Sequence, residues 1–292
     1  MTPSSPMSLD LRAVHDELLA KWDEFASNPQ TLRGRRRDVV PVARFTVVFG
    51  LASHVHETSR ILRHAAAERV PPAALSLVRV MYECGLTAAW AANVEDADDA
   101  MVHEHSRNAG NLKRTLAKSQ DPRWRDLAET VADADEASPT SPESAAQARY
   151  FERLCEDLDD DVVGYGMYRQ LSQYSHASVR LVDEYVDLPD DSNVASPGSD
   201  RRPALQPSGK SQAEAYYRLA LTTMVWSARA VTLLAPDPDF ARNLRRIARK
   251  LEVKDVLGLS HGYAARRVRA ARAARVAERS AAATRPTRGS RR

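Results

Sequence analysis

The sequence predicts an all-α protein, a single bundle of seven to nine helices with no sheet. Apolar residues recur with helical periodicity through almost the whole chain, whereas the alternation typical of strands is almost absent. Glycine is scarce, with 11 residues among 292, and proline falls at the edges of the periodic segments. Apolar residues make up 43% of the chain, which is enough to fill a core and excludes global disorder.

Capping residues and prolines mark where the helices begin and end. Ser8 is typical of an N-cap, Pro71-Pro72 separates two long helices, and Asp121-Pro122 and Asp237-Pro238 each begin another helix. We expect helices at about residues 8–27, 38–69, 71–93, 96–119, 121–137, 143–157, 165–186, 213–235 and 237–251.

These helices are expected to form one domain. We predict a disordered N-terminus at residues 1–7, a helical bundle at 8–262, and a basic Ala/Arg tail at 263–292 that is frayed or disordered. The stretch 188–212 is rich in Pro, Ser, Gly and Asp and is predicted to be a long loop inside the domain. The roughly 80 residues that follow this loop would form too thin a second core.

The charge is unevenly distributed. Residues 266–292 carry ten Arg and one Glu, whereas the rest of the chain carries 32 basic and 38 acidic residues. Such a tail can attract RNA, DNA or anionic lipid without sequence preference, or it can be a solubilising extension with no dedicated partner.

Several function classes are disfavoured. The first residues lack the pattern of a signal peptide, and no stretch reaches the ~18 uninterrupted apolar residues of a transmembrane helix. Two cysteines, Cys84 and Cys155, cannot build a disulfide framework or a metal knuckle. No Gly-rich phosphate loop is present. We therefore expect a cytoplasmic protein without a transmembrane segment, a bound metal or a cofactor.

The segment from Pro71 to Asn93 is apolar almost all round, with Arg79 and Glu83 as its two formal charges. A helix that is hydrophobic on every side is expected to be central and buried. An isolated buried charge is very costly, so these two residues need partners. The sequence therefore predicts one internal polar site that contains an arginine and a glutamate.

A second polar group falls on the predicted helix 165–186. One of its faces gathers hydrogen-bond donors within about 100° of the helical wheel. These residues are Arg169, Ser172, Gln173, His176 and Arg180. A solvated helix face explains such a stripe, but Ser172, Tyr174 and His176 are short or aromatic, unlike the Lys and Glu typical of a surface.

Two segments, LVRVMYECGLTAAW at 77–90 and YRQLSQYSHAS at 168–178, resemble an uncharacterised bacterial all-helical family of unknown function. Its members carry Arg-x-x-x-Glu on one helix and Tyr-x-x-Leu-Ser-x-x-x-His on a later helix. Arg79 and Glu83 match the first motif, and Tyr168, Ser172 and His176 match the second. We expect the two helices to contact each other through these residues.

The second segment also resembles the HEPN superfamily of helical bundles, whose nuclease members carry Arg, four to six residues, and then His. Six residues separate Arg169 from His176. In such enzymes the pair faces a dimer seam, and the RNA is cut without metal by its own 2′-hydroxyl. The resemblance implies that Arg169 holds the phosphate and His176 acts as acid and base, with Glu83 and Arg79 orienting them. Gln170 stands where the nuclease members usually have a small polar residue.

The leading hypothesis is therefore a homodimer that acts on RNA, as a metal-independent endoribonuclease of toxin or phage-response type. Its binding residues would be Arg79, Tyr168, Ser172 and Tyr174. The alternative is a non-catalytic binding or interaction protein, in which Arg79, Glu83 and His176 form a structural network across the core. A nucleic-acid-binding accessory driven by the tail needs no active site.

Overall fold

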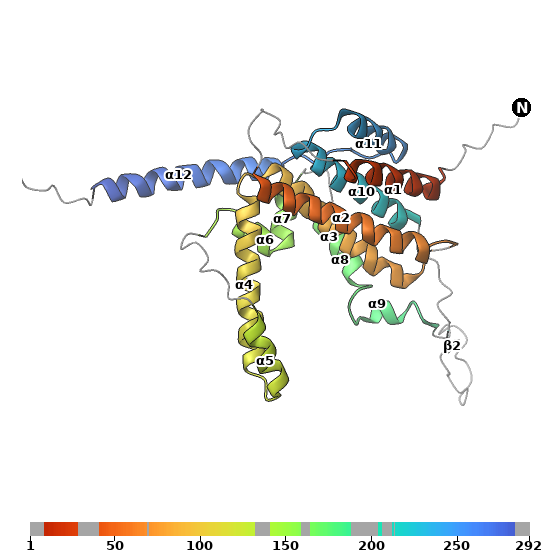
Figure 1. Ribbon diagram of the computed structural model, residues 1–292, viewed down its shortest axis with the longest axis horizontal. Helices are drawn as coiled ribbons and strands as arrows, with labels where there is room; N and C mark the ends of the chain where they lie inside the picture. The colour runs from red at the N-terminus through yellow and green to blue at the C-terminus, as the bar shows by residue number, and fades with distance from the viewer. Residues whose placement is uncertain are drawn as a thin grey trace, which may run out of the picture. The chain divides into compact units, whose positions relative to one another are not determined.

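A computed structural model describes residues 9–28, 41–68, 70–131, 141–158, 164–187, 204–205, 212 and 214–283 (Figure 1). The chain divides into two compact units. The first comprises residues 1–98 and 163–257, and the second comprises residues 99–162 and 258–292. The expected disordered N-terminus at 1–7, nearly all of the expected loop at 188–212, and the end of the tail from residue 284 lie outside the described residues.

The all-α class is confirmed. The described residues contain twelve α-helices and the short 3₁₀ helix η1 (Pro72–Ala74). One antiparallel pairing joins the two-residue strands β1 (Val186–Asp187) and β2 (Ala204–Leu205) and is too short to form a layer. The expected count of seven to nine helices was too low, because two predicted helices are each divided in two and the tail adds another helix.

The core of the first unit is built on α3 (Leu75–Asn93), which packs between α2 (Val42–Ala65) and α10 (Glu214–Leu234). The prediction that the apolar helix is buried is confirmed, since Met81, Leu86 and Trp90 are fully enclosed. α10 is also buried along nearly its whole length. Both helices are hydrophobic on most sides because each has neighbours on several sides.

The other side of α2 and α10 is covered by α1 (Leu11–Ala26) and α11 (Pro238–Lys250). α1 begins two residues later than expected from Ser8, because Asp10 accepts hydrogen bonds from the backbone N–H groups of Arg12 and Ala13 at 2.9 and 3.1 Å. Aromatic rings fill the contact between these helices. Trp22 of α1 stacks on His56 of α2 with ring centroids 4.1 Å apart.

The predicted helix 165–186 is divided in two. α8 (Gly164–Ser172) ends after two turns, and α9 (Val179–Val182) begins after a turn. Ser178 has an extended backbone, and its hydroxyl accepts a hydrogen bond from Leu181 N, so it caps α9. Short hydroxyl side chains compete with helical backbone bonds, which favours a break in a Ser-rich stretch.

The second unit contains most of α4 (Ala97–Ala117), together with α5 (Pro122–Thr130), α6 (Ala145–Arg149), α7 (Phe151–Asp157) and α12 (His261–Ala283). The predicted helix 143–157 is interrupted at Tyr150, whose backbone is extended. α12 packs its first turns against α7.

The tail was expected to be frayed or disordered from residue 263; the structure describes it as part of α12 as far as Ala283. Alanine and arginine are among the best helix formers, so a long Ala/Arg run favours a helix. The start of α12 is also anchored. Ser260 Oγ accepts a hydrogen bond from Tyr263 N at 3.1 Å, and Arg266 pairs with the buried Asp157.

Candidate functional site

The two motif-bearing segments meet where α3 contacts α8. Arg79 of α3 donates a hydrogen bond from Nε to Ser172 Oγ at 3.1 Å, and another from Nη2 to the hydroxyl of Tyr168 at 2.5 Å. The guanidinium also lies over the Tyr168 ring, 4.7 Å from its centroid. The predicted contact between the two helices is therefore present, and Arg79 makes it.

The local structure of α8 presents these partners. Tyr168 and Ser172 are four residues apart and therefore lie on the same face of the helix. Ser172 Oγ also donates to the carbonyl of Tyr168 at 2.8 Å, which fixes its lone pairs toward Arg79. The Arg79 side chain keeps 18% of its surface exposed. We infer that this arrangement clamps α8 onto α3.

Glu83 lies at the edge of this cluster. Its carboxylate is 3.6 Å from Arg79 Nη2, one turn along α3, and the side chain is 40% exposed. An ion pair this open to solvent is weak. The expectation of an internal glutamate was wrong, because the side of α3 that carries Glu83 is not covered as the opposite side is.

Tyr174 is buried beyond the end of α8. Its hydroxyl accepts hydrogen bonds from Arg180 Nε and Nη2 at 3.2 and 3.1 Å, and its carbonyl accepts one from Ser76 Oγ at 3.3 Å. Burial raises the pKa of the Tyr174 phenol above its ordinary value, which the bonds from Arg180 oppose. Arg180 in turn pairs with Glu184 at 3.4 Å. Tyr174 thus belongs to a separate group of contacts from Arg79.

The proposed catalytic pair lies outside both groups. Arg169 is exposed on α8, and His176 is exposed in the turn that follows it. Within the described part of the chain neither side chain has a hydrogen bond or an ion pair, and Glu83 is paired with Arg79 rather than with His176. The expected cluster of Glu83, Arg79 and His176 is therefore not formed. The helical wheel placed His176 beside Ser172, but α8 ends at Ser172.

Three contacts were missed by the sequence reasoning. The residues around Tyr174 include Ser76, which bonds its carbonyl, and Glu184, which pairs with Arg180. The ring of Tyr216 lies edge-on to the ring of Tyr174, with the two ring centroids 6.2 Å apart. Ser76 stands three residues before Arg79 and thus on the same face of α3, a spacing that could have indicated its contact. No sequence signal links Tyr216 to Tyr174, since they join two distant segments.

In the second unit, α12 carries basic side chains in a regular row. Arg269, Arg272 and Arg275 are exposed and spaced three residues apart. None of the three has an ion-pair partner among the residues whose side chains the structure describes. Arg266 and Arg267, one turn earlier, are instead paired with Asp157 and Glu143.

No group of histidine, cysteine or carboxylate side chains suited to hold a metal ion occurs in the described ranges. None of the helices described there has the length and apolarity needed to cross a membrane. Neither Cys84 nor Cys155 forms a disulfide within the described ranges.

Comparison with known proteins adds one finding. The model of a family of unknown function, DUF5677, matches residues 45–193, a range that contains α3, α8 and both motifs. No curated protein and no solved structure matches the chain.

Proposed function

Because the chain belongs to DUF5677, a family of unknown function, we propose its function from its own side chains: a cytoplasmic, homodimeric protein that binds RNA through the exposed arginines of α12. The observation that carries this proposal is the row of Arg269, Arg272 and Arg275, each exposed and without an ion-pair partner among the described side chains. Guanidinium groups bind phosphate through paired hydrogen bonds, and unpaired ones lose no existing contact on binding.

The spacing of the row suits a phosphate backbone. Three residues advance a helix by about 4.5 Å, so the three guanidinium groups follow one side of α12. Such contacts are electrostatic and independent of sequence, and each releases counterions when it forms. RNA affinity should therefore fall steeply with salt.

The Arg79 cluster is a less suitable ligand site. The Nε and Nη2 groups of Arg79 already bond Ser172 and Tyr168, and a ligand would have to displace these contacts. This supports the structural interpretation of Arg79, in which its role is to hold α8 against α3.

The test is a titration of single-stranded RNA with the full chain and with the triple variant Arg269→Gln, Arg272→Gln, Arg275→Gln. Each lost phosphate contact should reduce the slope of log K against log salt by about 0.7, so the triple variant should lose about 2. Circular dichroism checks that α12 remains helical, since glutamine is a good helix former.

A matched control removes three arginines from α4 and α5 in the same unit: Arg114→Gln, Arg123→Gln and Arg125→Gln. The control has the same net charge and should keep the salt slope of the unmodified chain. Equal loss in both triple variants would attribute binding to net charge alone and would contradict the proposal.

A second candidate function is metal-independent RNA cleavage by Arg169 and His176. The observation in its favour is that both side chains are exposed and unpartnered within the described ranges, and so are open to a substrate. An imidazole can exchange a proton near neutral pH, and an arginine can clamp the phosphate as charge develops. Glu83 has no role in this proposed cleavage mechanism, because it is paired with Arg79.

Cleavage is tested with mixed RNA in the presence of a chelator. The cleavage rate should fall at least a hundredfold in Arg169→Ala and in His176→Ala, whereas Glu83→Gln should cleave at the unmodified rate. Sedimentation of the unmodified chain tests the homodimer. RNA that stays intact with the unmodified chain, or that both alanine variants cut at the unmodified rate, rejects catalysis and leaves the binding proposal to its own test.

A further inference from the structure

α11 distributes its basic side chains over two faces. On the side that faces α1, Arg246 pairs with Glu17, and Lys250 Nζ lies 3.3 Å from the same carboxylate. One carboxylate therefore compensates two cations, and this face is explained by the packing of α11 on α1.

The other basic face of α11 is not compensated in this way. Arg242, Arg245 and Arg249 are spaced by three and four residues, so they form one exposed row. Arg242 has an exposed partner, Asp239, at 2.9 Å, a pair of little energetic value. Arg245 and Arg249 have no ion-pair partner in the part of the chain that the structure describes.

The segment after α11 folds back beside this row. Glu252 has a positive φ of 58°, and Val253 N donates a hydrogen bond to the carbonyl of Ala248 at 3.0 Å. This is the hydrogen-bond pattern of a Schellman motif, which satisfies the last carbonyls of the helix. The turn satisfies carbonyl groups at the negative C-terminal end of α11, and it brings Lys254 to the basic face.

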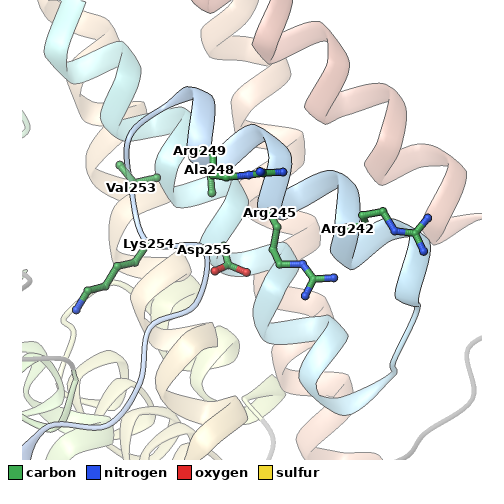
Figure 2. A pocket seen from close by; sticks show the side chains of 7 residues that line it. All are labelled: Arg242, Arg245, Ala248, Arg249, Val253, Lys254 and Asp255. Carbon is green, nitrogen blue, oxygen red and sulfur yellow. The ribbon is translucent and has the colours of Figure 1, made fainter.

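Helix and turn together line an open hollow of about 400 Å³ (Figure 2). Its cationic lining comes from Arg242, Arg245, Arg249 and Lys254, and its small apolar lining from Ala248 and Val253. Figure 2 shows the three arginines in a row along α11, with Lys254 reaching outward from the loop.

The single carboxylate of the hollow is already engaged. Asp255 Oδ2 lies 3.0 Å from Arg229 Nε of α10, and Arg229 is only 12% exposed. Asp255 is therefore paired with Arg229 rather than with the arginine row. Like charges three and four residues apart on one helix face repel one another, and an anion bound beside them would relieve that repulsion.

We propose that this hollow binds a small polyphosphate of the nucleotide class, a nucleoside di- or triphosphate. Forked guanidinium groups suit phosphate oxygens, and their planes also stack on a base. The volume falls within the range of small-molecule sites, roughly 300–1,000 Å³, and exceeds what one phosphate fills. The site lies in the first unit and is independent of the RNA-binding row on α12.

The test is calorimetric titration of the full chain with ADP, tripolyphosphate and AMP at physiological salt. We expect saturable one-to-one binding of ADP and tripolyphosphate and weaker binding of AMP, which has fewer charges. The double variant Arg245→Gln, Arg249→Gln should bind ADP at least tenfold more weakly. The matched control, Arg246→Gln, Lys250→Gln, removes two charges from the other face of the same helix and should bind ADP within twofold of the unmodified chain.

Melting curves show that each variant is folded before it is titrated. The α12 triple variant should retain ADP binding, which separates a failure here from a failure of the RNA proposal. Absence of saturable ADP binding, or an equal loss in both double variants, overturns the nucleotide site. The same holds if Arg245 and Arg249 affect affinity for an RNA oligonucleotide but not for ADP, because the row would then be a nucleic-acid contact.

Discussion

Gly85 of α3 and Thr223 of α10 are in direct contact at the centre of the first unit. A Cβ atom placed on Gly85 would lie 2.3 Å from Thr223 Cγ2, closer than any two such carbons can approach. Thr223 is fully buried, and its hydroxyl donates to the carbonyl of Leu219 at 2.8 Å. The absence of a side chain at position 85 therefore sets how closely the two central helices pack.

Gly85→Ala should destabilise the protein. Alanine favours a helix over glycine by about 1 kcal/mol, but overpacking a rigid core costs about 1–3 kcal/mol, and Thr223 is β-branched and enclosed. We expect a net loss of up to about 2 kcal/mol in urea unfolding. Adding Thr223→Ser removes the clashing methyl group and should recover most of that loss; a variant as unstable as Gly85→Ala alone would show that the contact is not the cause.

The contacts that hold α8 against α3 predict that substitutions of Arg79, Tyr168 and Glu83 lower the unfolding free energy by different amounts. Arg79→Met keeps the side-chain volume but removes two hydrogen bonds, and we expect a loss of about 1–3 kcal/mol in unfolding free energy. Tyr168→Phe retains the ring beneath the guanidinium and should cost about 0.5–1.5 kcal/mol. Glu83→Gln breaks an ion pair that is open to solvent and should cost less than about 0.5 kcal/mol.

A double-mutant cycle between Arg79→Met and Tyr168→Phe measures their coupling directly. The two residues are in contact, so the cycle should show a coupling of at least about 0.5 kcal/mol. Strict additivity, or a Glu83→Gln variant as unstable as Arg79→Met, would disprove the clamp.

Two buried histidines predict a loss of stability in mild acid. Burial lowers the pKa of His15 to about 4, assisted by the charge of Arg63 and Arg60 and opposed by Asp16. Burial also lowers the pKa of His56 to about 3, although its bond to the Ala52 carbonyl acts in the opposite direction. The Nε2 atoms of both rings are buried without a hydrogen-bond partner.

The direction follows from linkage. In the unfolded chain both histidines take up a proton near pH 6.5, whereas in the folded chain they do so only at about pH 4 or below. The free energy of unfolding is therefore highest above pH 6.5 and decreases as the pH falls below that value. At pH 5 each histidine should contribute a loss of up to about 2 kcal/mol. Urea unfolding between pH 5 and 7.5 measures the slope. His15→Gln should reduce it and the exposed His105→Gln should not; equal slopes in all three proteins would refute the assignment.

The anchor of α12 predicts a contrast between adjacent arginines. Arg266 makes two hydrogen bonds to Asp157, whose side chain is 4% exposed, so Arg266→Ala leaves a buried carboxylate without its main partner. We expect a loss of about 2–4 kcal/mol in the stability of the second unit and a reduced helical signal at 222 nm. Arg267→Ala breaks a more exposed pair with Glu143 and should cost less than about 1 kcal/mol. Equal losses would mean that the anchor does not depend on burial of Asp157.

Several features could be predicted from local pattern. The burial of α3 follows from its continuous apolar sequence, and the start of α11 follows from Asp237-Pro238, where Asp237 accepts hydrogen bonds from the backbone of residues 239 and 240. The contact between the helices that carry Arg79 and Ser172 was expected from the resemblance of the two segments to a helical family. Tyr168 and Ser172, four residues apart, share the helix face that meets Arg79.

Other features depend on contacts between distant segments. The end of α8 at Ser172 separates His176 from the Arg79 cluster, and helical periodicity alone continues past that point. Glu83 is 40% exposed although it stands one turn from Arg79, which depends on how the neighbouring helices are placed. The hollow beside α11 exists because a turn at Glu252 returns the chain to the arginine row.

The sequence by itself determined the all-helical class, the central helix and the two segments that meet, since local periodicity and the burial of apolar side chains act residue by residue. Only the tertiary structure decided which polar groups became partners. Which polar groups pair depends on where the helices end and how closely they pack, because a hydrogen bond is lost when its donor and acceptor are about an ångström too far apart.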